Sequence, residues 1–128
     1  MRYLLDVNAL IAFGHTEHQF HKRVASWAAS IDIPHFATSS ITELGFVRIV
    51  SHVYGATIPQ AQNLLVRLKE YEDLDFDFLP DDHDASKLPA WVTAAKHTTD
   101  GHLAELAKAN NCVLATLDEN IPGAFIIP

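Results

Sequence analysis

The 128-residue sequence carries 9 Lys and Arg against 16 Asp and Glu, a formal net charge of -7 at pH 7, and 48% of its residues are hydrophobic. This composition is typical of globular proteins and excludes a disordered or fibrous chain, and the length predicts a single domain over residues 1–128. With no apolar run of roughly 18 residues, no signal peptide and one cysteine, Cys112, we expect a soluble cytoplasmic protein without membrane contacts.

The predicted elements alternate along the chain between short apolar strands and amphipathic helices whose apolar residues recur every three or four positions. In chain order they are a strand at 2–5, helices at 8–13 and 18–30, a strand at 35–38, helices at 43–53 and 58–71, a half-exposed strand within 73–80, a loop at 81–89, a helix at 99–109, and strands at 112–116 and 124–127. Candidate N-caps are Ser39, Ser40 and Thr42 for the third helix and Asp84 in the loop. Cys112 is predicted to be a buried strand residue.

This alternation predicts an α/β sandwich with a central, mostly parallel sheet flanked by helices. In such sheets, ligands bind beyond the carboxyl ends of the strands. Four acidic residues are predicted to meet there: Asp6 after the first strand, Glu43 in the helix after the second, Asp100 at the start of the helix before CVLAT, and Asp118 after CVLAT. Each alone is equally typical of a helix cap or a first-turn acid, but four at one edge indicate a functional site.

Clustered carboxylates require a proton or a cation between them, because two like charges about 4 Å apart repel by about 4 kcal/mol at an effective dielectric constant of about 20. Oxygen ligands alone suit Mg²⁺ or Mn²⁺, and a cation of this kind favours phosphodiester hydrolysis. Asn8 follows Asp6 by two residues and Thr116 precedes Asp118 by two, so both are candidates for orienting the carboxylates. Their alternative roles are to cap a helix and to form hydrogen bonds with the backbone groups at the end of a strand.

The runs LLDVNALIA, SSITELGFVRIVS and HTTDGHLAELAKANNCVLATLDENI, in this order, closely resemble the PIN-domain ribonucleases, in particular the VapC-type toxins of bacterial toxin-antitoxin pairs. The resemblance implies a PIN-like three-layer sandwich and a Mg²⁺- or Mn²⁺-dependent endoribonuclease acting on structured RNA such as transfer RNA. It also implies a homodimer and a cognate antitoxin. By this resemblance the acidic set is Asp6, Glu43, Asp100 and Asp118, the metal contacts are Asp6, Asp100 and Asp118, and the supporting residues are Asn8 and Thr116. Gly101 stands where alanine is common in the family, which predicts a first helical turn looser by up to roughly 1 kcal/mol.

An RNA partner is compatible with the negative net charge because of how that charge is distributed. Eight of the 16 acidic residues lie between Glu70 and Asp84, a segment without Lys or Arg, which leaves eight acidic and nine basic residues elsewhere. Arg48 and Lys96 are candidates for holding an RNA phosphate, with an internal ion pair and a solvated position as their respective alternatives. His15, His18 and His21 recur every third residue, but without accompanying ligands they favour packing or surface roles over a metal site.

Two alternative functions remain open from the sequence. A receiver-type phosphoacceptor domain has a similar size and fold class, but it pairs two early acids and places a lysine after a late strand, whereas this chain has one early acid and continues with Thr116 and Asp118. A catalytically silent PIN-fold binding module would keep the fold and a protein partner without turnover.

Overall fold

The computed structural model describes residues 1–128 and is built on a five-stranded sheet in the order β3-β2-β1-β4-β5. All four pairings between neighbouring strands are parallel, which confirms the predicted parallel sheet. The strands are β1 (Tyr3–Leu5), β2 (His35–Ser39), β3 (Asp75–Leu79), β4 (Val113–Thr116) and β5 (Phe125–Ile126). Because every strand runs the same way, all their carboxyl ends lie at one edge of the sheet.

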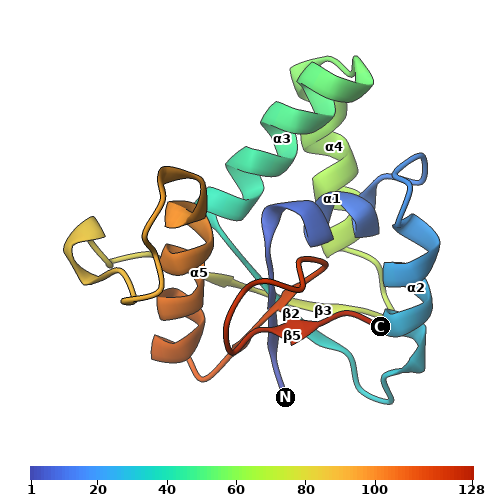
Figure 1. Ribbon diagram of the computed structural model, residues 1–128. Coiled ribbons are helices and arrows are strands. Elements are labelled where there is room, and N and C mark those ends of the chain that lie inside the picture. The colour runs from blue at the N-terminus through green and yellow to red at the C-terminus, as the bar shows by residue number, and fades with distance from the viewer.

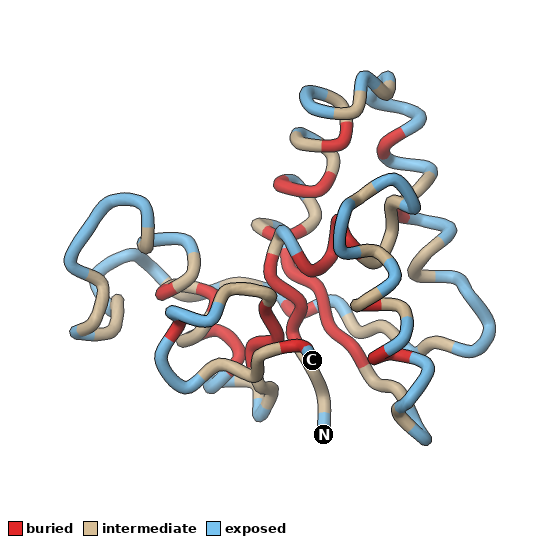
Figure 2. Tube along the Cα trace, turned by 45° about the vertical axis from the view of Figure 1, so that its right-hand side comes forward, coloured by how far each residue is buried: buried red, intermediate tan, exposed pale blue.

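Helices cover both faces of this sheet, so the molecule has three layers (Figure 1). They are α1 (Val7–Gly14), α2 (His21–Ser30), α3 (Ser40–Tyr54), α4 (Ile58–Lys69) and α5 (Thr98–Ala109), with 3-10 turns η1 (Ala85–Lys87) and η2 (Ala95–His97) before α5. Alternate residues of β1 face opposite layers: Leu5 joins the core beneath α1, α2 and α3, whereas Leu4 packs in a second core with Leu103 and Leu106 of α5. Figure 2 shows that the buried backbone is concentrated in the central strands.

Helices α3 and α4 form the pair that rises above the rest of the molecule in Figure 1. Ser39 caps α3 in a capping box with Thr42, as the sequence predicted. The chain then reverses at Gly55, whose φ of 73° is easily adopted only by a residue without a side chain. Thr57 and Gln60 form a second capping box at the start of α4. The left-handed Gly55 at the end of α3 and the capping box at the start of α4 therefore set this reversal.

The start of α2 differs from the prediction, because this helix begins at His21 and not at His18. His18 Nδ1 accepts a hydrogen bond from the backbone N–H of Phe20 at 3.0 Å, and this local contact holds the chain in a turn before the helix. The prediction for Cys112 was also wrong. Cys112 is half-buried and precedes β4, and its Sγ accepts a hydrogen bond from Arg2 Nε at 2.9 Å.

Other predicted boundaries agree with the structure within a few residues, and Asp84 caps η1 by accepting from the Ser86 N–H at 2.9 Å. None of the helices combines the length and the apolar character needed to span a lipid bilayer.

Candidate active site

Asp6 lies at the carboxyl end of β1 and is the only charged residue that is buried, with 5% of its surface exposed. Its backbone N–H continues the strand pairing by donating to Ala115 O at 3.1 Å. One carboxylate oxygen caps α1 by accepting from the Ala9 N–H at 2.8 Å, and the other accepts from Thr116 Oγ1 at 2.5 Å. Asp6 is thus a helix cap whose second oxygen is held toward β4.

Thr116, the last residue of β4, connects Asp6 to a second carboxylate. Its Oγ1 donates to Asp6 and accepts from the Asp118 N–H at 3.0 Å. The Asp118 side chain in turn accepts from the Asn120 N–H at 2.9 Å through Oδ1. This chain of contacts fixes two acids, from β1 and from the loop after β4, at neighbouring positions of the sheet edge.

A cavity of about 450 Å³ opens between α1, α3 and the start of α5. It is lined by Asp6, Val7, Asn8, Ile11, His18, Ile49, Tyr54, Thr99, Asp100, Thr116 and Asp118. The third acid, Asp100, is half-buried in the first turn of α5. Five of the residues singled out from the sequence therefore line one cavity although they come from distant parts of the chain.

The electrostatics of the cavity disfavour three ionised carboxylates without a counterion. Burial raises the pKa of Asp6 to about 6, against the opposing hydrogen bonds from Thr116 and Ala9, and the charges of Asp100 and Asp118 raise it further. Burial and the Asp118 charge likewise raise the pKa of Asp100. No Lys or Arg lines the cavity. An all-oxygen donor set of this charge fits a hard divalent cation such as Mg²⁺ or Mn²⁺.

Glu43 lies near the same sheet edge, in the first turn of α3, but its side chain does not line the cavity. Its Oε2 accepts from Thr38 Oγ1 at 2.5 Å and from Lys69 Nζ at 2.6 Å. The pair with Lys69, contributed by the end of α4, is about three-quarters buried. No local sequence signal could have indicated this contact, because the two residues meet only when α3 and α4 pack together.

Arg48 and Lys96 are exposed, line no wall of the cavity and form no ion pair. In contrast, the cavity includes His18, Tyr54 and Thr99, which sequence reasoning did not assign to the site. For His18 the three-residue histidine spacing is a signal, but in the sequence it favours a packing or surface role over a place in the site. Tyr54 and Thr99 gave no comparable signal.

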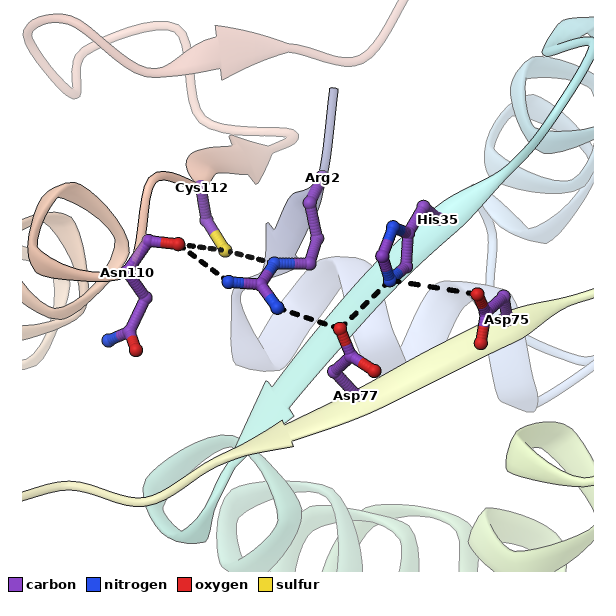
Figure 3. Close-up of polar contacts among 6 residues, drawn as sticks. All are labelled: Arg2, His35, Asp75, Asp77, Asn110 and Cys112. Carbon is purple, nitrogen blue, oxygen red and sulfur yellow. Dashed lines mark hydrogen bonds and ion pairs between the residues drawn. The ribbon is translucent and has the colours of Figure 1, made fainter.

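A second group of close polar side chains lies at the opposite, N-terminal edge of the sheet (Figure 3). Potential ligand atoms of His35, Asp75 and Asp77 lie within 4.8 Å of one another. The Asp77 Oδ2 atom contacts both Arg2 Nη1 at 2.7 Å and His35 Nε2 at 2.8 Å, and the Arg2 hydrogen bond leads the contacts that lower the pKa of Asp77. Arg2 also donates to Asn110 O at 2.6 Å. Through Arg2, which precedes β1, this network therefore connects β2 and β3 to the end of α5, away from the cavity.

Comparison with known sequences identifies relatives along nearly the whole chain. A model of the PIN domain family matches residues 3–124. Ribonuclease VapC38 of Mycobacterium tuberculosis is 32% identical over 124 residues, which cover 92% of this chain and 86% of the relative. Ribonuclease VapC44 of the same species is 31% identical over 134 residues, which cover 97% of this chain and 94% of the relative.

Two solved structures share the fold. The crystal structure of Mycobacterium tuberculosis VapC20, described as a Sarcin-Ricin loop cleaving toxin, has a TM-score of 0.64 and 11% identity, with 98% of this chain and 99% of that chain covered. The structure of VapBC2 from Rickettsia felis bound to a DNA fragment from their promoter has a TM-score of 0.55 and 18% identity, with 98% and 97% covered. At these identities the similarity extends to the fold alone.

Proposed function

This chain belongs to the PIN-domain family and within it to the VapC ribonucleases, and from that premise we propose that it is a metal-dependent endoribonuclease that hydrolyses RNA phosphodiester bonds. The observation that carries the proposal is the convergence of Asp6, Asp100 and Asp118 on one cavity at the carboxyl edge of the sheet. The family assignment leaves the receiver-type alternative without support.

We further propose that the chain is the toxin of a toxin-antitoxin pair and acts on structured RNA such as transfer RNA. The support is the pairing implied by the VapBC2 structure and the toxin description of VapC20, two proteins that share this fold. A cognate antitoxin and a second copy of the chain are the expected protein partners. We expect the protein to act in the cytoplasm, where both its RNA substrate and its antitoxin would be present.

The proposed metal ligands are Asp6, Asp100 and Asp118, whose oxygens would hold Mg²⁺ or Mn²⁺. When bound, such a cation supplies Lewis-acid chemistry to a phosphate and to water. Thr116 keeps Asp6 and Asp118 in place for this task through the hydrogen bonds described above. In the reaction, water attacks phosphorus, one P–O bond breaks, and the leaving oxygen takes up a proton. Glu43 is proposed as the fourth acid, held at the margin of the site by Lys69 and Thr38.

The test is cleavage of a pool of small structured RNAs by antitoxin-free protein, with Mn²⁺ or Mg²⁺ compared with EDTA. The decisive variant is Asp100→Asn, because the Asp100 carboxylate makes no hydrogen bond within the protein and its loss removes only a ligand. Asp32→Asn is the matched control, since it removes the same charge from an exposed residue before β2, at the opposite edge. Discrete fragments that require metal and Asp100, but not Asp32, support the nuclease.

Two other results would count against the proposal. Fragments that persist unchanged in Asp100→Asn, or in EDTA, come from a contaminating nuclease. A folded wild-type protein that cleaves nothing over a wide range of RNAs favours the catalytically silent binding module.

A further inference from the structure

His18 and Asn8 lie side by side on the wall of the acidic cavity, and their contact determines how Asn8 faces a ligand. Asn8 is in the first turn of α1, two residues after Asp6, and His18 is in the turn that joins α1 to α2. His18 Nε2 lies 2.9 Å from Asn8 Oδ1. The Asn8 side chain makes its one hydrogen bond to His18 and none to a carboxylate.

The hydrogen bonds of His18 assign its tautomer. The Phe20 N–H can only donate, and it donates to His18 Nδ1, so Nδ1 carries no proton. The neutral ring then carries its proton on Nε2, and this N–H donates to Asn8. Burial, followed by the charges of His15 and His21, lowers the pKa of His18, which favours the neutral ring at pH 7.

This tautomer also fixes the Asn8 amide, whose oxygen and nitrogen are otherwise interchangeable by a flip. An Nε2–H donor must face the amide oxygen and not the NH₂ group. The Asn8 NH₂ group is left with two donors and no acceptor in the protein. A cavity walled by carboxylates thus also presents neutral hydrogen-bond donors.

The turn that carries His18 is itself held by the other two histidines. His15 Nδ1 accepts from the Glu17 N–H at 3.2 Å, and the His15 ring stacks on Tyr54 of α3 with centroids 4.1 Å apart. His21 Nδ1 lies 2.8 Å from Ala12 O and donates to that carbonyl. The three-residue histidine spacing is therefore explained by backbone and stacking contacts that keep His18 in place.

We propose that His18 is a positioning residue for the reaction, because it turns the Asn8 NH₂ group toward the cavity, where this group donates hydrogen bonds to the phosphate backbone of RNA. The inference rests on the proposed ribonuclease function. An amide suits this position because it binds phosphate oxygens without the positive charge that would pair with the neighbouring Asp6 and displace a metal ion. Because it contacts the backbone, Asn8 would act on RNAs of any sequence.

The test uses two variants that separate the two nitrogens of His18. His18→Asn keeps an acceptor for the Phe20 N–H but cannot reach Asn8, whereas His18→Gln places an N–H donor near the position of Nε2. With a fluorescently labelled RNA hairpin that wild type cleaves, we expect kcat/KM to fall about tenfold in His18→Asn, as for the loss of one hydrogen bond, and to recover largely in His18→Gln. Gln19→Ala, an exposed neighbour, is the control and should match wild type.

A double-variant cycle distinguishes positioning from loop stability. In an Asn8→Ala background, His18→Asn should cause no further loss in kcat/KM, since the amide that it orients is already gone. A full tenfold loss in that background, or none in His18→Asn alone, would overturn the proposal.

The ring ¹⁵N spectrum of His18 provides a readout that does not depend on turnover. We expect a protonated Nε2 and an unprotonated Nδ1 at pH 7, and the opposite tautomer would overturn the assignment even if the enzyme is active. A wild-type protein with the expected tautomer that cleaves no RNA would instead overturn the proposed function, and the catalytic use of Asn8 with it.

Discussion

At the scale of single residues, the acids of the site differ in what holds them. Asp100 makes no hydrogen bond within the protein, Asp6 and Asp118 are joined through Thr116, and Glu43 is already paired with Lys69. A carboxylate that is already paired with a lysine should bind a metal ion more weakly than one that faces a cavity without basic residues. The four acids should therefore not be equivalent.

We expect Asp100→Asn and Asp118→Asn to lower the cleavage rate by at least about 100-fold, because partners one step removed from a metal already contribute about 10–100-fold. Glu43→Gln should lower it less than about tenfold, since an amide can still accept from Thr38. Single-turnover cleavage at saturating Mn²⁺ would measure this, with circular dichroism as the check on folding. A loss in Glu43→Gln as large as in Asp100→Asn would show that Glu43 leaves Lys69 to act in the reaction.

Asp6 also links the site to stability through its pKa of about 6 in the fold, against 3.8 for the unperturbed group. Between these values the folded state holds the proton that the unfolded state has lost, so the free energy of unfolding falls as pH rises from about 4 to above 6. The full loss is about 3 kcal/mol, from about 1.4 kcal/mol per pKa unit. In EDTA at pH 8, Asp6→Asn should therefore be more stable than wild type by up to about 3 kcal/mol, because asparagine still caps α1.

Urea unfolding of the two proteins at pH 8 and below pH 4 measures this difference. The advantage of Asp6→Asn should vanish at the lower pH, where Asp6 is protonated in both the folded and the unfolded wild-type protein. At pH 8, Mg²⁺ should stabilise the wild-type protein and not the variant. An advantage of equal size at both pH values would mean that the variant acts through packing and not through the charge.

At the scale of elements, Gly101 in the first turn of α5 shows how packing can override helix propensity. A Cβ atom added there would lie 2.3 Å from Val92 Cγ2 and 3.2 Å from Pro89 Cδ. We expect Gly101→Ala to destabilise the fold by about 1–3 kcal/mol, as overpacking does, despite a propensity gain of up to about 1 kcal/mol. Urea unfolding would measure this change in stability. Adding Val92→Ala to Gly101→Ala should recover part of the loss. A Gly101→Ala protein more stable than wild type would contradict the close approach of Val92 and Pro89 to this glycine.

The contrast between local signals and tertiary packing also explains what could be predicted from the sequence. Capping residues such as Ser39 and Asp84, the apolar periodicities and the acids after strands are local signals. They predicted the layers, the parallel sheet and five of the eleven residues that line the cavity. Contacts made only by tertiary packing were not predictable. Examples are the Lys69 pair of Glu43 and the approach of Val92 to Gly101, which makes this glycine a packing requirement where the sequence indicated only a looser turn.

At the scale of the whole molecule, the acidic residues are concentrated in one segment that contributes nothing to the cavity lining. Half of the acidic residues lie in the segment 70–84, which includes the edge strand β3. Arg48 is exposed on α3, which contributes Ile49 and Tyr54 to the cavity lining, and Lys96 is exposed in η2, immediately before α5. RNA approaching the carboxyl edge would meet these two cations with no internal ion pair to break. Their contribution should be to binding and not to the chemical step.

We therefore expect Arg48→Gln and Lys96→Gln to raise KM with little change in kcat, and each to reduce the slope of log affinity against log salt by about 1. Lys108→Gln is the matched control, because Lys108 is equally exposed but lies at the far end of α5, beside the N-terminal edge of the sheet. Binding of a labelled RNA hairpin to the Asp100→Asn protein, titrated with KCl, would give the slopes without cleavage. If all three variants keep the wild-type slope, the phosphates are held by uncharged donors of the cavity, and RNA affinity should then depend only weakly on salt.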